Sequence, residues 1–181
     1  MVRLMMLLAV LCSCAAPGTE VDVHLGERLM DDRNFYREVD EHEAFGLSAV
    51  HDGWEVAYFG SRTDYSDSMV AGAVNVDELS LGYRWTHDVG PVRFYLGPGV
   101  MYAQGEGSAA GSSAYNPSFD FTESDSSGGF YWHAGVAVEL LQGLLVGFDV
   151  RQVLGTRIRL DGFPESDLDY TQGTLFLGWS W

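Results

Sequence analysis

The last twelve residues of the chain alternate between two kinds of side chain. One register holds Trp181, Trp179, Leu177, Leu175 and Gly173, and the other holds Ser180, Gly178, Phe176, Thr174 and Gln172. Because successive side chains of a strand point to opposite faces, residues 170–181 are predicted to form a strand with one apolar and one small or polar face. A tilted strand that crosses a bilayer has this length, and aromatic residues at its ends.

The same alternation recurs along the chain. The other predicted strands are 21–30, 44–50, 54–61, 77–86, 92–103, 129–140 and 144–160. Their connections alternate between long polar loops and tight turns, with loops at 31–43, 62–76, 105–128 and 161–169 and turns at 51–53, 87–91 and 141–143. The pattern predicts an all-β fold, an eight-stranded antiparallel up-and-down transmembrane β-barrel with four long loops at one rim.

The apolar face is expected to point outward, toward lipid. A soluble barrel such as a lipocalin would instead place it inside. All five tryptophans share the apolar register and most lie near strand ends, as in an aromatic girdle at a membrane interface; they are Trp54, Trp85, Trp132, Trp179 and Trp181. The opposite register carries glycine in seven of the eight predicted strands. Because an eight-stranded interior is narrow, small and charged side chains fit inside it and the large apolar set does not.

The N-terminus is predicted to be an export signal, residues 1–13, with Arg3 before a short apolar core. Leu11-Cys12-Ser13-Cys14 resembles the lipobox of bacterial lipoproteins, which implies cleavage before Cys14 and acylation of its thiol. Ordinary cleavage near Ala15 and Ala16, without a lipid, is the alternative. Residues 14–20 would then be a linker and 21–181 the barrel. Both cysteines lie in this segment, so the barrel contains no disulfide and no cysteine metal ligand.

The chain is strongly acidic, with a formal net charge of −16 at pH 7, and every basic residue is arginine. This balance excludes nucleic acid as a partner and argues against binding to an anionic surface by bulk charge. The acidic loops 31–43 and 161–169 become neighbours if the first and last strands close the barrel. A shared calcium or magnesium site is one interpretation. No EF-hand spacing supports it, and a solvated acidic rim is the other; no cofactor is expected.

Over residues 21–181 the chain resembles the small eight-stranded outer-membrane barrels of Gram-negative bacteria, the OmpA-barrel, OmpX and OmpW-like group. The resemblance implies a monomer in the outer membrane, in contact with its lipids and lipopolysaccharide, with periplasmic termini and extracellular long loops. Residues 173–181 look like the C-terminal signal that the barrel-assembly machinery reads. That family usually ends in Phe and carries no lipid, so Trp181 and the lipobox are departures from it.

Charged residues on the inward register predict a network that plugs the tight-turn half of the barrel. Arg84 and Arg93 are expected to face each other across the turn near Asp88. Two opposed guanidiniums repel, so carboxylates must flank them. The expected network comprises Glu55, Arg84, Arg93, Glu139, Asp149 and Arg151. A set of satisfied core charges is one interpretation, and a gated proton or ion path is the other.

No catalytic group is predicted. Lipid A acyltransferases and deacylases exist on this architecture, but the deacylase pattern needs a His and a Ser two residues apart on a lipid-facing strand. Here Ala134 and Gly135 follow His133. His51 and His87 are expected to cap turns and His24 to be a core histidine, which leaves no nucleophile and base pair. We therefore expect a non-enzymatic barrel with a structural or surface-interaction role. A narrow channel or lateral passage for small apolar molecules, as in OmpW-like proteins, is the alternative, and a lipid A-modifying enzyme ranks third.

Overall fold

The computed structural model describes residues 18–30, 41–66, 70–111, 119–158, 166–167 and 169–181. The strands of this part of the chain are β1 (Thr19–Met30), β2 (Glu41–His51), β3 (Trp54–Ser66), β4 (Val70–Tyr83), β5 (Trp85–Val89), β6 (Val92–Gly111), β7 (Phe119–Leu141), β8 (Leu144–Leu154), β9 (Arg157–Ile158), β10 (Ser166–Asp167) and β11 (Tyr170–Ser180). The predicted signal 1–13 and Cys14 lie outside the described residues. Thr19 and Glu20, predicted to be linker, begin β1.

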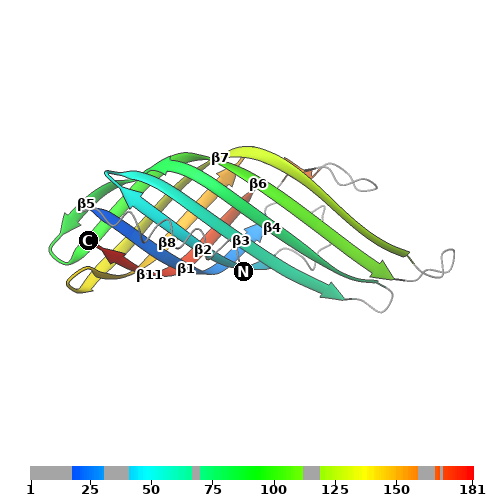
Figure 1. The fold of residues 1–181 in the computed structure, drawn as a ribbon, viewed down its shortest axis with the longest axis horizontal. Helices are drawn as coiled ribbons and strands as arrows, with labels where there is room; N and C mark the ends of the chain where they lie inside the picture. Colours follow the sequence, from blue (N-terminus) through cyan, green and yellow to red (C-terminus); the bar gives the residue numbers. More distant parts are fainter. Residues whose placement is uncertain (1–17, 31–40, 67–69, 112–118, 159–165, 168) are drawn as a thin grey trace.

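The main sheet is closed and antiparallel. Its strand order is β4-β3-β2-β1-β11-β8-β7-β6-β5, and β4 also pairs with β6. Because β4 and β5 are one strand interrupted at Arg84, eight strands surround the interior. Figure 1 shows them steeply tilted, as closure of so few strands requires. The prediction of an eight-stranded antiparallel barrel is confirmed.

The three short connections lie at one end of the barrel, called here the tight-turn end; the opposite end is the loop end. Each turn uses a glycine with positive φ: Gly53 at 82°, Gly90 at 61° and Gly143 at 85°. The end of the chain meets its described beginning here, since Gly18 N donates to Trp181 O at 2.8 Å and Trp181 N donates to Thr19 O at 3.0 Å.

Two of the predicted loops are largely strand. Residues 62–76 were expected to be a loop, but β3 continues to Ser66 and β4 starts at Val70, in register. Within 105–128, β6 and β7 stay paired as far as Gly111 and Phe119. Backbone hydrogen bonds form a ladder whatever the side chains are, and apolar alternation is needed only where one face is buried. These polar hairpins project beyond the other strands at the loop end (Figure 1).

Two further boundaries differ from the sequence prediction. Residues 87–91 were predicted to be a turn, yet β5 continues to Val89, which pairs with Val92. The turn is therefore only two residues long. The alternation read as far as residue 160 also ends early, because β8 stops at Leu154 and is followed by Gly155 at a φ of 79°.

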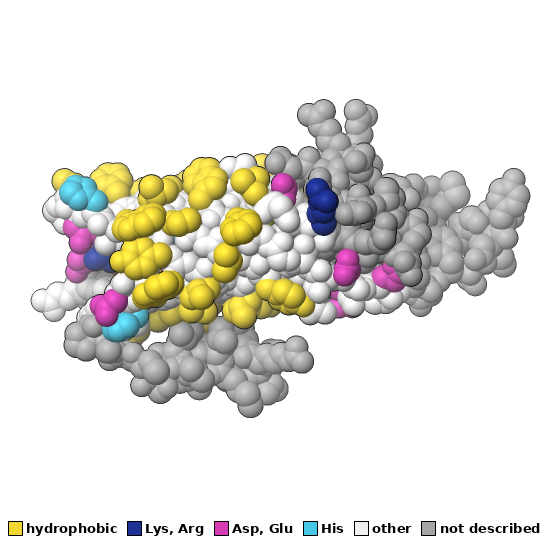
Figure 2. All heavy atoms as spheres, turned by 90° about the horizontal axis from the view of Figure 1, so that it is seen from above, with side chains coloured by type: hydrophobic (Ala, Val, Ile, Leu, Met, Phe, Trp, Pro, Cys, Tyr) yellow, Lys and Arg dark blue, Asp and Glu magenta, His cyan; other side chains and the backbone are white. Residues whose placement is uncertain are grey.

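The apolar face points outward, as expected. Leu25, Phe130 and Leu175 are 65%, 71% and 65% exposed, whereas their neighbours His24, Tyr131 and Phe176 are buried. In Figure 2 the hydrophobic side chains form a band around the tight-turn half of the visible surface, with charged residues beyond it at both ends. In the described residues no helix is long and apolar enough to cross a membrane.

Candidate functional site: the charged interior of the barrel

Arg84 is the centre of the first ionic cluster, which lies toward the tight-turn end. Its Nε donates to Glu55 Oε2 at 2.7 Å, and its Nη1 donates to Glu20 Oε1 at 2.7 Å. Asp22 Oδ2 lies 3.3 Å from the same Nη1. The guanidinium stacks on the ring of Tyr95, with 4.4 Å between Cζ and the ring centroid. Arg84 thus connects β1, β3 and β6 across the interior.

Arg93 belongs to this tight-turn cluster but does not face Arg84. The register pairs Arg93 with Asp88, because the turn is shorter than predicted. Arg93 Nε donates to Asp88 Oδ1 at 2.9 Å, and Nη1 donates to Glu20 Oε2. One carboxylate of β1, Glu20, therefore bridges the two guanidiniums. Glu20 was not predicted because the expected strand started at Val21, two residues later than β1 does, although the parity of Glu20 with Asp22 places it on the inward face.

Glu139 lies outside the network. A β-bulge between Glu139 and Leu141 shifts the register at the end of β7. The side chain is exposed, and its Oε1 accepts a hydrogen bond from Gly143 N at 3.0 Å in the turn. The carboxylate expected to flank Arg93 is thus a turn cap instead.

His133 and Asp149 close the tight-turn cluster on the opposite wall. His133 Nδ1 lies 3.0 Å from Asp149 Oδ2, and its Nε2 lies 3.6 Å from Glu55 Oε2. His24 lies in the same part of the interior, with Nε2 3.1 Å from Ser48 Oγ and Nδ1 3.2 Å from Thr174 Oγ1. These histidines make hydrogen bonds of a packed core.

A second cluster, the loop-side cluster, contains Arg151 and four residues that were not part of the expected network. Arg151 Nη2 donates to Glu78, which also accepts from Tyr170 OH. Arg28 Nε donates to Gln172 Oε1 at 3.0 Å, and its Nη2 lies 3.5 Å from Glu78 Oε2. Asp149 and Arg151, expected in one network, belong to two.

Aromatic rings occupy the space beside the ions. Inward glycines make room for them: a Cβ on Gly46 would lie 2.3 Å from the Phe59 ring, and a Cβ on Gly147 would lie 2.3 Å from the Phe176 ring. Arginine side chains also lie over interior rings: Arg151 Cζ is 3.6 Å from the centroid of the Tyr131 ring. Several glycines of the inward register are therefore contact sites for interior rings, a pairing that periodicity alone does not reveal.

An apolar cluster lies beside the loop-side ions. Its buried members are Val76, Met101, Ala103, Tyr131, Val153 and Tyr170, with Met30 and Val74 packed against them. Tyr131 and Tyr170 contact both the apolar cluster and the loop-side ions, because Arg151 lies over the Tyr131 ring and Arg28 lies over the Tyr170 ring. Ionic groups and aromatic rings therefore occupy both the tight-turn and the loop-side parts of the described interior.

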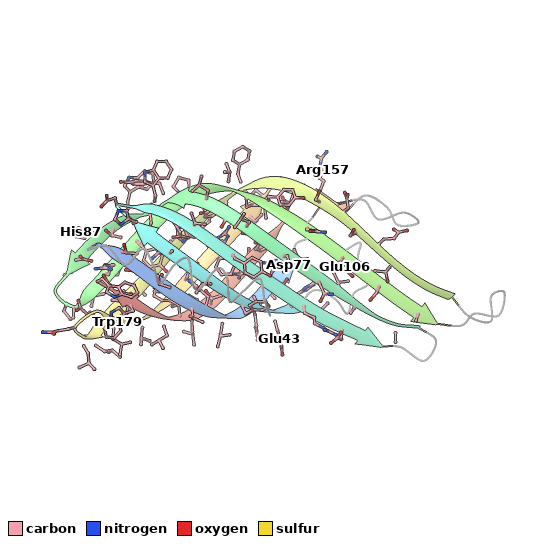
Figure 3. All side chains as sticks on the ribbon, viewed as in Figure 1. Glu43, Asp77, His87, Glu106, Arg157 and Trp179 are labelled. Atoms are coloured by element: carbon pink, nitrogen blue, oxygen red, sulfur yellow. The ribbon has the colours of Figure 1, made fainter. Side chains whose placement is uncertain are left out.

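The tryptophans point outward. Trp54, Trp85, Trp179 and Trp181 are exposed near the tight-turn end, the end at which Figure 3 labels both Trp179 and His87. Trp132 is also exposed but lies farther along β7, where its Nε1 donates to Gln152 Oε1 at 3.1 Å. Four of the five are placed as one girdle would require, and Trp132 stands apart.

The projecting part of β3, β4, β6 and β7 carries charges on its outward face. Asp77 and Glu106 lie there, toward the loop end from Trp179 (Figure 3). Tyr58 OH donates to Asp77. Arg62 Nη2 donates to Asp64 at 2.9 Å, and this hydrogen bond and the nearby charge raise the pKa of the guanidinium above its usual value. The positive charge of Arg62 is therefore paired with a carboxylate of its own strand.

No metal site is apparent in the part of the chain that the structure describes: no group of three His, Cys, Asp or Glu side chains is arranged to hold an ion. Most acids of the loops 31–43 and 161–169 lie outside that part. His51 contacts Asp52 at the turn, with 3.5 Å between Nε2 and Oδ2.

No protein-family profile and no curated protein sequence matches the chain. Solved structures do. The attachment invasion locus protein Ail of Yersinia pestis, crystallised with the heparin analogue sucrose octasulfate, superposes with a TM-score of 0.53 at 14% identity, over 90% of this chain and 96% of its own.

Two other structures are similar to the same degree. Neisserial surface protein A gives a TM-score of 0.51 at 12% identity, over 90% of this chain and 96% of its own. The outer membrane protein OprG of Pseudomonas aeruginosa gives 0.51 at 14%, over 91% and 96%. At these identities the likeness concerns the fold alone. The chain has the fold of the small eight-stranded outer-membrane β-barrels.

Proposed function

We propose that this protein is a monomeric, non-enzymatic outer-membrane β-barrel, and that its role is structural or in interaction at the cell surface. The observation that carries the proposal is the division of its outer surface into an apolar band and polar strands that project beyond it at one end. The apolar band is suited to contact with lipid, and the polar projecting strands are suited to contact with water. The ionic clusters and rings that fill the interior stabilise the barrel rather than conduct.

The tight-turn end, with the C-terminus, would face the periplasm, and the projecting hairpins the outside. Short periplasmic turns and long outer connections are the rule for bacterial barrels. The band would contact outer-membrane lipids and lipopolysaccharide, and β11 would be read by the barrel-assembly machinery. Cys14 would carry the lipid anchor, which mass spectrometry of the mature N-terminal peptide tests.

The acidic outward face limits the class of surface ligand. Ail was crystallised with a polyanion, but the projecting sheet here presents Asp77 and Glu106, while Arg62 is paired with Asp64. A polyanion would be repelled by this face. Any ligand of the surface is therefore expected to be neutral or cationic.

Cysteine labelling in intact cells tests the orientation. Ser124→Cys lies on the exposed face of projecting β7, and His87→Cys lies near the tight-turn end. A membrane-impermeant maleimide is expected to label Ser124→Cys in intact cells and His87→Cys only after lysis, with the unsubstituted chain as background control. Equal labelling of both in intact cells, or labelling of His87→Cys alone, would contradict the proposal.

A narrow channel or a lateral passage for small apolar molecules is the alternative function, and a lipid A-modifying enzyme ranks below it. Conductance in planar bilayers separates the channel from the proposed function. Lipid A mass spectra from cells with and without the protein separate the second: a protein-dependent change in acyl chains would establish the enzyme.

A further inference from the structure

Strand β5 (Trp85–Val89) has an unpaired side at the tight-turn end. It stands last in the strand order of the main sheet, and among the described strands it pairs with β6 alone. All five of its residues are exposed. Figure 1 shows the hairpin of β5 and β6 reaching the tight-turn extremity of the molecule. One side of β5 therefore has no neighbouring strand in the part of the chain that the structure describes.

The hydrogen bonds toward β3 end at Arg84. The register of β4 with β3 stops one residue before it, and Arg84 N donates to Gly53 O at 2.7 Å in the adjoining turn. Alternate residues of a strand direct their N–H and C=O groups to the same side. Thr86 and Asp88 therefore direct theirs to the side that β3 does not cover. The backbone groups of these two residues are called here the free edge.

Aromatic rings border the free edge on the outward face of the barrel. Between centroids, the Trp54 and Tyr83 rings are 5.6 Å apart, and the Tyr83 and Trp85 rings are 5.5 Å apart. A Cβ at Gly53 would lie 2.6 Å from the Tyr83 ring, so the turn between β2 and β3 packs closely on these rings. An added strand would therefore meet an apolar surface on its outward side.

The exposed charge beside the free edge is negative. The side chain of Asp52, in the adjoining turn, is 81% exposed, and that of Asp88 is 57% exposed. The nearby cation, Arg93, is only 23% exposed, and its guanidinium contacts Asp88 and Glu20. This arrangement favours a cationic partner.

The free edge lacks the usual protection against strand addition. Unpaired N–H and C=O groups at the edge of a sheet are a template for another strand, and lysine or proline on an edge strand commonly blocks it. β5 contains neither. A second copy of the chain does not suit the edge, because two copies inserted in the same direction would present their β5 strands in the same direction and could not pair antiparallel. Their carboxylates would also repel.

We propose that β5 is a docking site for an extended basic segment of another protein, which adds a strand at the free edge. Thr86 and Asp88 supply backbone hydrogen bonds, as in other cases of strand addition. Apolar side chains of the segment lie against Trp54 and Trp85, and its lysine or arginine side chains reach Asp52 and Asp88. In the proposed orientation the partner comes from the periplasm, but the free edge itself does not depend on that orientation.

Peptide binding to the folded full chain in nonionic detergent micelles tests the docking site. The probe is a short fluorescent peptide that alternates lysine and valine. Its binding should slow the solvent exchange of the Thr86 and Asp88 amides, measured by NMR, by about tenfold or more at saturation. The amide of His87, which faces β6, should exchange at an unchanged rate. A glutamate–valine peptide, and a lysine–valine peptide methylated on its backbone nitrogens, should each bind at least about tenfold more weakly.

Thr86→Pro removes one donor of the free edge and leaves the hydrogen bonds between β5 and β6 in place. It should weaken binding of the lysine–valine peptide about tenfold or more, whereas Thr86→Val, which keeps the N–H, should not. Asp52→Asn should weaken binding at low ionic strength, and Glu139→Gln, an exposed carboxylate on the other side of β6, is its matched control. If Thr86→Pro does not fold, the methylated peptide removes hydrogen bonds from the partner's side instead.

Two outcomes would overturn the docking site. One is no binding of the lysine–valine peptide, and the other is binding that leaves the Thr86 and Asp88 amides unprotected, which would reduce the interaction to charge attraction. A protein that dimerises in micelles with these amides already protected would assign the edge to a second copy, which also overturns the proposal. None of these outcomes changes the orientation that cysteine labelling tests.

Discussion

The guanidinium of Arg84 contacts three carboxylates that are almost fully buried. Glu20, Asp22 and Glu55 reach it from two different strands, and none of these side chains is more than 9% exposed. The attraction between such groups largely offsets the cost of taking them out of water. Removing the shared cation leaves that cost uncompensated, so Arg84 is the residue on which the interior depends most.

Arg84→Met is therefore expected to destabilise the barrel by about 3–5 kcal/mol, the usual loss when one partner of a buried ionic group is removed. Urea unfolding in micelles measures it. Adding Glu55→Gln should recover part of the loss, since one uncompensated carboxylate disappears with it. Arg62→Met, the same change in an exposed pair with Asp64, is the control and should alter stability little. Equal losses in Arg84→Met and the double variant would show that the pairing is unimportant.

At the scale of elements, strand length follows pairing rather than apolar content. The parts of β6 and β7 at the loop end are rich in Gly, Ser and acidic residues, a composition that predicts a loop over 105–128. The ladder nevertheless joins Gly105 to Asp125 and Gly107 to Glu123. The alternation of apolar residues in the sequence ends where the apolar band ends, whereas the backbone hydrogen bonds between β6 and β7 continue beyond it.

Hydrogen exchange distinguishes a projecting hairpin from a loop. Peptides covering 104–108 and 123–127 are expected to exchange more slowly than an unstructured reference, by on the order of tenfold or more, because local opening must break the ladder first. The band portion of β6, around Leu96, should exchange more slowly still and serves as the internal control. Exchange of 104–108 at the unstructured rate would restore the loop interpretation.

For the molecule as a whole, the crossing contacts decide whether the barrel is open. Arg84 joins β1 to β3, and His133 on β7 reaches both Asp149 on β8 and Glu55 on β3. Together with the rings of Tyr95 and Phe176, these contacts fill the tight-turn half of the interior. A barrel closed in this way has little free space for a continuous water path.

The reconstituted protein is therefore expected to show no steady open state in planar bilayers at neutral pH. Arg84→Met, if it folds, should raise the frequency of brief openings. Unboiled protein should run differently on a gel from boiled protein, which confirms that the reconstituted sample is a folded barrel. A steady conductance of the unsubstituted, gel-verified barrel would favour the channel alternative.

Local chemistry allowed much of this molecule to be deduced from the sequence. The period-2 alternation established the number of strands in the wall, the outward face and the inward position of Glu55, Arg84, Asp149 and Arg151. Side-chain parity is a property of the strand itself, so no long-range information is needed to read it. The closing strand β11 displays this best, since every second residue from Tyr170 to Gly178 is buried and the residues between them are half-buried or exposed.

The tertiary structure alone decided which charges meet. A partner across the interior depends on register and closure, and a turn shorter by three residues paired Arg93 with Asp88 instead of Arg84. A bulge moved Glu139 out of the network, and the pairing of β1 with β11 closed the barrel so that Glu20 on β1 could reach Arg84, between β4 and β5. Periodicity records the face of each strand, but the offset between strands is set by the turns, bulges and closure of the whole barrel.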